Sequence, residues 1–185
     1  MIEWNATETV MEAIKQSIRP VTTVAQLRQV LTQDFPRDCT DLPISGGWGY
    51  ARDSAIRFVH QQFPPSRADF VPLEYHISQK IYEELIIFRS KDHRFSGIKL
   101  NRNMQNLVDY EGRKYDLIEF TITCWADQHW ALLKTEWEQN DFGMRFGFDV
   151  NAHNAKRNAS QVRYAREFWF DISEVFGLTT PKVHT

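Results

Sequence analysis

The feature that most constrains this chain is a strict alternation of apolar and polar side chains between residues 118 and 124. The apolar members are Ile118, Phe120, Ile122 and Cys124, and the polar members are Glu119, Thr121 and Thr123. A period of two is typical of a strand that buries one face. Turn-forming residues at 109–113, with Gly112 among them, predict a reversal near Glu111. The sequence therefore predicts an antiparallel hairpin between residues 98–108 and residues 114–125.

The position of the reversal also predicts the register of the hairpin. It places Ile98 opposite Cys124, Leu100 opposite Ile122 and Met104 opposite Ile118. Both arms would then bury the same apolar face, with Arg102 opposite Phe120 as the exception. The other face of the first arm carries polar side chains, and we expect it to be exposed. Its members are Lys99, Asn101, Asn103 and Gln105.

Apolar residues at helical spacing predict helices before the hairpin. Capping residues at Asn5 and Thr23 begin two of them, which end before Pro20 and at the Phe35-Pro36 pair. A short strand is predicted over residues 55–60. Residues 73–89 fit a helical face or, in their last part, a buried strand, and we favour a helix that becomes a strand near Leu85.

Two further helices are predicted after the hairpin. The first has Asp127 as its N-cap and turns Trp130 and Trp137 inward. The second runs from about residue 151 to Phe176 and turns Trp169 inward, because apolar residues recur along one stripe and a glycine follows as a stop.

These elements predict an α+β fold in which an antiparallel sheet with a central long hairpin packs against N-terminal and C-terminal helices. Residues 1–177 would form a single domain and residues 178–185 a tail. Aromatic residues make up 14% of the chain, which predicts a core dominated by large flat side chains.

Charge and hydropathy restrict the classes of partner. A net charge of −2 with 25% charged residues gives no overall basic field, which disfavours nucleic acid as a partner. The N-terminus lacks the basic and apolar stretches of a secretory signal, and no segment approaches the roughly 20 apolar residues needed to cross a bilayer. We therefore expect a soluble, cytoplasmic protein with no membrane partner and with two reduced cysteines.

The usual catalytic and cofactor motifs are missing from the sequence. The six histidines lack zinc-site spacing, and neither a serine elbow nor a phosphate loop is present. We therefore expect no metal and no cofactor. Cys39 with His60 is a weak candidate for thiol chemistry. The alternative to a binding protein is a hydrolase-like enzyme that uses His129, His153 and Asp127.

Two aromatic segments are candidates for protein binding. In the glycine-rich segment 45–50, Trp48 and Tyr50 would either pack onto the sheet or serve as an exposed anchor. The loop at 140–150 places Phe142 and Phe146 beside Arg145 and breaks regular periodicity with two glycines. Either its phenylalanines cap the end of the core between the two flanking helices, or at least one phenyl ring is exposed as a contact for a partner. An aromatic residue beside an arginine is a common interface anchor.

Two segments carry a resemblance to known proteins: Leu-Pro-Ile-Ser-Gly-Gly-Trp-Gly-Tyr at 42–50 and Ile-Tyr-Glu-Glu-Leu-Ile-Ile-Phe at 81–88. They resemble stretches of small uncharacterised bacterial proteins, some of which are associated with toxin and immunity gene neighbourhoods. The resemblance implies an immunity-like or inhibitor-like role. The sequence as a whole predicts a non-catalytic domain that binds another protein.

Overall fold

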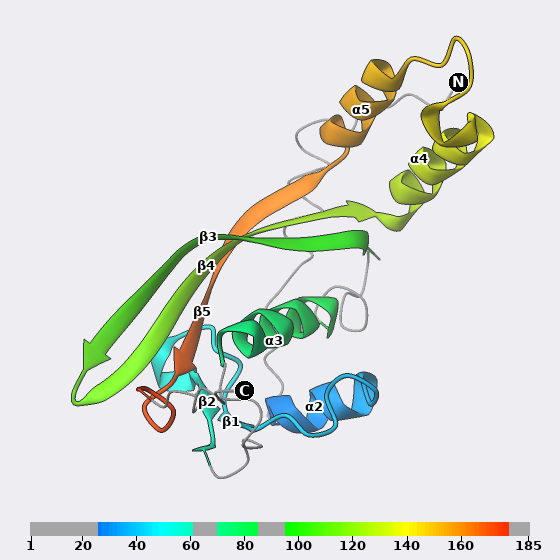
Figure 1. The fold of residues 1–185 in the computed structure, drawn as a ribbon. Helices are drawn as coiled ribbons and strands as arrows, with labels where there is room; N and C mark the ends of the chain where they lie inside the picture. The colour runs from blue at the N-terminus through cyan, green and yellow to red at the C-terminus, as the bar shows by residue number, and fades with distance from the viewer. Residues whose placement is uncertain (1–25, 61–69, 85–94, 178–185) are drawn as a thin grey trace, which may run out of the picture.

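The computed structural model describes residues 26–60, 70–84 and 95–177, which form a five-stranded sheet with helices (Figure 1). The strand order is β1-β2-β5-β4-β3, and every neighbouring pair is antiparallel except β2 with β5. The elements are α2 (Leu27–Asp34), β1 (Ile44–Gly46), β2 (Ile56–Phe58), α3 (Val71–Glu83), β3 (Phe95–Tyr110), β4 (Arg113–Ala126), α4 (Asp127–Gln139), α5 (Val150–Ala159) and β5 (Val162–Asp171). The α+β prediction is confirmed, but the sheet is mixed and not purely antiparallel.

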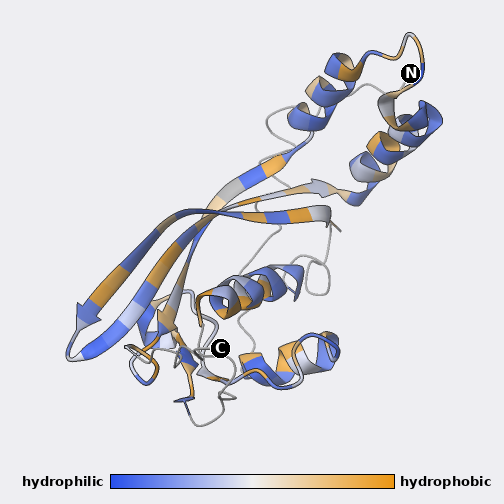
Figure 2. Cartoon of the chain, in the orientation of Figure 1, coloured by the Kyte–Doolittle hydropathy of each residue, from blue (hydrophilic) through white to orange (hydrophobic). Residues whose placement is uncertain are grey.

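The predicted hairpin is confirmed as β3 and β4. Its turn is formed by Glu111 and Gly112, whose positive φ angles of 50° and 75° match the two-residue turns that suit the twist of paired strands. Leu100 lies opposite Ile122, as predicted. Along β4, apolar and polar side chains alternate in the hydropathy colouring, and Phe120 is fully buried (Figure 2).

The predicted register is wrong beyond Arg102, and a shift between Ser96 and Lys99 leaves Ile98 out of the predicted pairing with Cys124. A register shift between Arg102 and Met104 places Met104 opposite Glu119, on the outer face, and Gln105 opposite Ile118, on the inner face. A bulge of this kind changes which residues of a strand face the core, because side chains alternate with a period of two. Met104 is consequently 41% exposed, so the two arms do not bury the same apolar face throughout.

The predicted helix from about residue 151 to Phe176 is also wrong. Its first part is α5, but Val162–Asp171 is β5, which lies between β2 and β4. Val162, Phe168 and Phe170 are fully buried, while Arg163 and Glu167 are exposed. The segment therefore carries a period of two as well as a helical stripe, and pairing with β4 along its whole length stabilises the strand.

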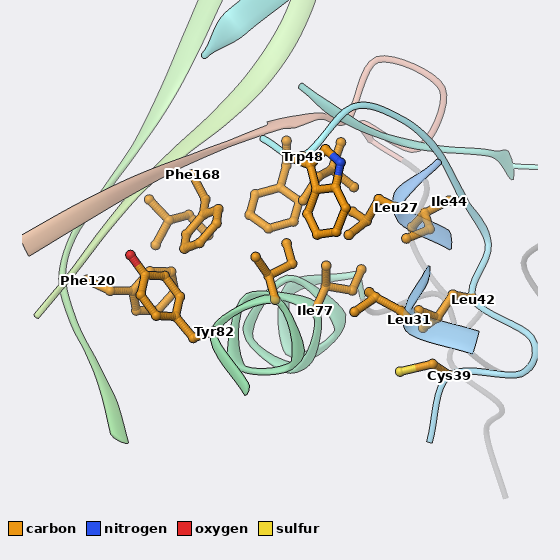
Figure 3. Close-up of a cluster of buried hydrophobic side chains, with 14 of the residues drawn as sticks. Leu27, Leu31, Cys39, Leu42, Ile44, Trp48, Ile77, Tyr82, Phe120 and Phe168 are labelled. Atoms are coloured by element: carbon orange, nitrogen blue, oxygen red, sulfur yellow. The ribbon is translucent and has the colours of Figure 1, made fainter. Parts of the chain in front are cut away.

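Helices α2 and α3 cover one face of the sheet, and the main core lies between these two helices and the sheet (Figure 1). Figure 3 shows Leu27, Leu31 and Ile77 from these helices near Trp48. The predicted aromatic core is confirmed: the rings of Tyr82 and Phe168 are 5.6 Å apart edge to face, and other rings continue the cluster along the sheet.

Several other predictions are settled by the described residues. Helices are confirmed at α2, α3 and α4, and a short strand is confirmed at β2. The predicted cap at Asp127 is wrong, because Asp127 is the first residue of α4 and its carboxylate accepts a hydrogen bond from Ser96. The predicted helix from Asn5, the strand near Leu85 and the tail at 178–185 lie outside the described residues. Among the described helices, each is too short or too polar to cross a bilayer.

Replacement of Phe168 by Ala tests the corrected assignment of β5. Phe168 is fully buried, so we expect its truncation to lower the free energy of unfolding by about 3–5 kcal/mol in urea denaturation. Leu107→Ala is the control, because Leu107 is 53% exposed and its loss should change stability by about 0.5 kcal/mol or less. Phe168→Leu keeps the comparison measurable if the alanine variant does not fold. Equal stability of Phe168→Ala and the wild type would contradict the assignment.

Candidate functional site

The glycine-rich segment that contains Trp48 and Tyr50 belongs to the core. Trp48 is 8% exposed, and the ring of Tyr50 lies 5.9 Å from that of Phe168. The backbone of Gly49 accepts a hydrogen bond from the amide of Trp169 on β5, at 2.7 Å. Of the two alternatives for Trp48 and Tyr50, the structure shows packing onto the sheet and not an exposed anchor.

Three of the residues considered for catalysis are buried or bonded to groups outside the expected sets. Burial raises the pKa of Cys39 to about 11, so its thiol is not activated as a nucleophile. Asp127 bonds to Ser96, whereas His153 Nδ1 lies 2.9 Å from a carboxylate oxygen of Glu136. Within the described ranges, no three His, Cys, Asp and Glu side chains are placed to hold a metal ion.

Helices α4 and α5 instead form an arm that continues from the ends of β4 and β5, away from α2 and α3 (Figure 1). The arm has a small core of its own. The ring of Trp137 lies 5.1 Å from that of His153 and 6.1 Å from that of Phe148. Leu133 is buried beside them, and the carboxylate of Asp149 caps α5 by accepting the amide of Ala152 at 2.9 Å.

A charged cluster connects the two helices of the arm. One oxygen of Glu136 accepts a hydrogen bond from Lys156 Nζ at 2.5 Å, and the other contacts His153. The bond from Lys156, and secondarily that from His153, holds the pKa of Glu136 below its ordinary value of 4.5. Both partners belong to α5 and Glu136 belongs to α4, so ionised Glu136 stabilises the packing of the arm.

The loop at the tip of the arm has a defined conformation. The carbonyl of Asn140 accepts hydrogen bonds from the amides of Gly143 at 2.9 Å and Arg145 at 3.1 Å. Asp141 and Phe142 have positive φ angles of 52° and 56°, which non-glycine residues adopt at a cost. This backbone directs the side chain of Phe142 outward.

Three large apolar side chains project from this tip. Phe142 is 61% exposed, Met144 is 80% exposed and Phe146 is 104% exposed, and we call them the tip patch. Of the two alternatives for this loop, the structure shows the one with exposed phenyl rings. Sequence reasoning missed Met144, although its place between two glycines in an aperiodic stretch was a signal of exposure.

The charge around the tip patch is small and mixed. Arg145 is exposed between Asp141 and Asp149, which are exposed as well. On the adjoining turn of α4, Lys134 Nζ lies 3.7 Å from Glu138 Oε1, so those two charges compensate each other. The guanidinium of Arg145 donates to the carbonyl of Gln139 at 3.5 Å and forms no ion pair among the described residues. The tip therefore combines an apolar surface with one guanidinium that has donors available for a partner.

The comparisons with known proteins found no relative: no family model matches, and neither the curated proteins nor the solved structures contain a match. Any inference about the function of this chain must therefore start from its own side chains.

The packing of Gly143 offers a test of how firmly the tip is held. A Cβ atom at Gly143 would lie 2.5 Å from the ring of Trp137, and its φ of +85° disfavours any side chain. We expect Gly143→Ala to displace Trp137 and to reduce hydrogen-exchange protection across the arm. Gly147→Ala is the matched control, because its φ is +83° but nothing lies within 4 Å of the added atom. Equal loss of protection in the two variants would contradict this packing.

The cluster at Glu136 predicts a pH dependence of the arm. Since the pKa of Glu136 is lowered in the folded protein, its contribution to stability is present above pH 4.5 and disappears as the pH falls through the lower folded value. We expect exchange protection of α5 to decrease on acidification below that pH. Glu136→Gln should show a smaller decrease over the same pH range, which corrects for other carboxylates. The same pH profile in both proteins would refute the role of Glu136.

Proposed function

We propose that this chain is a protein-binding domain without chemistry of its own, and that it binds its partner through the tip patch. The observation that carries the proposal is the exposure of Phe142, Met144 and Phe146 on one ordered loop. Monomeric proteins seldom expose neighbouring large apolar side chains without a functional reason. A partner that covers these three side chains would remove their apolar surface from water.

Burial of the tip patch by a partner would contribute favourably to binding. Burial of one large apolar side chain contributes about 1.5–3 kcal/mol, and there are three here. The backbone hydrogen bonds of the loop hold it in one shape before binding, which lowers the entropy that association costs. A positive φ at Phe142 is a strain that a merely structural loop does not require.

The charges favour a protein partner over an anionic membrane surface. Two carboxylates, Asp141 and Asp149, flank the one cation Arg145, so the tip carries no basic cluster. Arg145 is suited to a carboxylate on the partner, with which it can form paired hydrogen bonds. We infer a partner with an apolar pocket and an acidic side chain at its edge.

The proposed role is that of an immunity-like or inhibitor-like protein, which masks a surface of its partner. Support comes from the resemblance of segments 42–50 and 81–88 to small bacterial proteins of toxin and immunity neighbourhoods. A projecting arm with an apolar tip is a suitable shape for insertion into a concave surface on another protein (Figure 1).

Site-specific photocrosslinking tests the proposal. A photoreactive residue at position 146, introduced in the native host, should crosslink one protein that is not captured from position 107, an exposed control site on β3. That protein, once purified, should bind the wild type, and Phe146→Ala and Arg145→Ala should each weaken binding by about 10-fold or more. Their melting temperatures should equal that of the wild type, because both side chains are exposed.

Three outcomes would refute the proposal. They are crosslinking to the same protein from both positions, unchanged affinity of both alanine variants, and crosslinking only between copies of this chain.

A further inference from the structure

A groove of about 350 Å³ lies on the face of the sheet opposite to α2 and α3, at the end nearest the arm. Its floor is formed by β4, where Thr121 and Thr123 alternate with the inward-facing Phe120 and Ile122. Its sides come from β3 and β5, because Lys99 and Arg163 are the two cross-strand partners of Thr123. The groove is therefore built on three adjacent strands and does not depend on a loop.

All the charged side chains that line the groove are basic. Lys99, Arg157 and Arg163 line it, and no carboxylate does. Neither Lys99 nor Arg163 forms an ion pair within the part of the chain that the structure describes. The guanidinium of Arg157 lies 5.2 Å above the ring of Trp125, which holds it at one end of the groove. This concentration of positive charge contrasts with the net charge of −2 for the whole chain.

The floor of the groove offers an unused hydroxyl group. Thr123 is 7% exposed, and its hydroxyl has no hydrogen-bond partner among the described residues. By contrast, the hydroxyl of Thr121 donates to the side-chain oxygen of Asn103 at 2.9 Å. An unpartnered hydroxyl between two unpaired cations is a suitable arrangement for an oxygen-bearing anion.

We propose that this groove binds the phosphate group of a small phosphorylated compound. Neighbouring strands are about 4.8 Å apart, so Lys99 and Arg163 originate about 10 Å apart, on either side of Thr123. Their side chains are long enough to place the forked guanidinium of Arg163 and the ammonium of Lys99 on either side of an anion bound over the threonine. The Thr123 hydroxyl donates to it from below.

Two observations favour a small ligand over a nucleic-acid strand. The volume is at the lower end of that of small-molecule sites. Further along the same face, Glu119 lies opposite Glu167, so a long polyanion that continued along the sheet would meet two carboxylates. A compact anion avoids them.

Titration by nuclear magnetic resonance tests this site in the whole chain. Inorganic phosphate and adenosine monophosphate, added at constant ionic strength, should shift the side-chain amides of Asn101 and Gln161 saturably, and the monophosphate should bind at least as tightly as phosphate. Lys99→Ala and Arg163→Ala should each reduce the affinity about 10-fold or more, since hydrogen bonds to charged groups are the strong ones. Lys134→Ala, which removes an exposed cation elsewhere, should leave the affinity unchanged.

Other outcomes would overturn the proposal. Shifts that do not saturate, or that persist in both groove variants, would show unspecific attraction of anions. Affinity for a single-stranded oligonucleotide that increases with its length, with no binding of the monophosphate, would show a nucleic-acid surface instead. Phe146→Ala should bind the monophosphate like the wild type, so this test is independent of the protein-binding proposal.

Discussion

The pairing of β4 with β5 is the interaction on which the rest of this structure depends. The two strands are hydrogen bonded from Cys124 with Val162 to Tyr115 with Asp171. On one face they place Phe120 and Phe168 against α3 and its neighbours, which forms the core. At their far ends they continue into α4 and α5, so the same two strands hold the arm in place. A defect in this pairing would disturb the core and the arm together, because one continuous ladder supports both.

The two proposed sites use different physical properties of this framework. The tip patch is an apolar surface whose loop is held by backbone hydrogen bonds and by the packing of Gly143 on Trp137. The groove is a polar surface held by the strands themselves, with unpaired cations on either side of Thr123. The tip patch would bind a partner through the hydrophobic effect, and the groove would bind a ligand through charge-assisted hydrogen bonds. The two sites can therefore have different ligands. Arg157 lines the groove at the point where the arm joins the sheet, because its carbonyl accepts a hydrogen bond from Trp125 on β4.

The candidate site was predictable only in part. The composition of the loop at 140–150 indicated exposed aromatic side chains, since Gly143 and Gly147 interrupt any period that would turn Phe142 and Phe146 inward. Trp48 was indistinguishable from them by sequence, because an aromatic residue among glycines suits a buried turn and an exposed anchor equally. For the groove, only the polar face that carries Lys99 was predicted. Lys99 and Arg163 lie on β3 and β5, and they meet only because both strands pair with β4.

By itself, the sequence determined the features that depend on residues close together in the chain. The alternation at 118–124 and the turn at Glu111 specify the hairpin, because side-chain period and turn geometry are local properties. The tertiary structure decided the rest. Residues 162–171 carry both a helical stripe and a period of two, and the open edge of β4 selects the strand. The shift between Arg102 and Met104 likewise decides which side chains of β3 face the core. Both depend on hydrogen bonds and packing between segments distant in sequence, whose free energy exceeds the small differences in local preference.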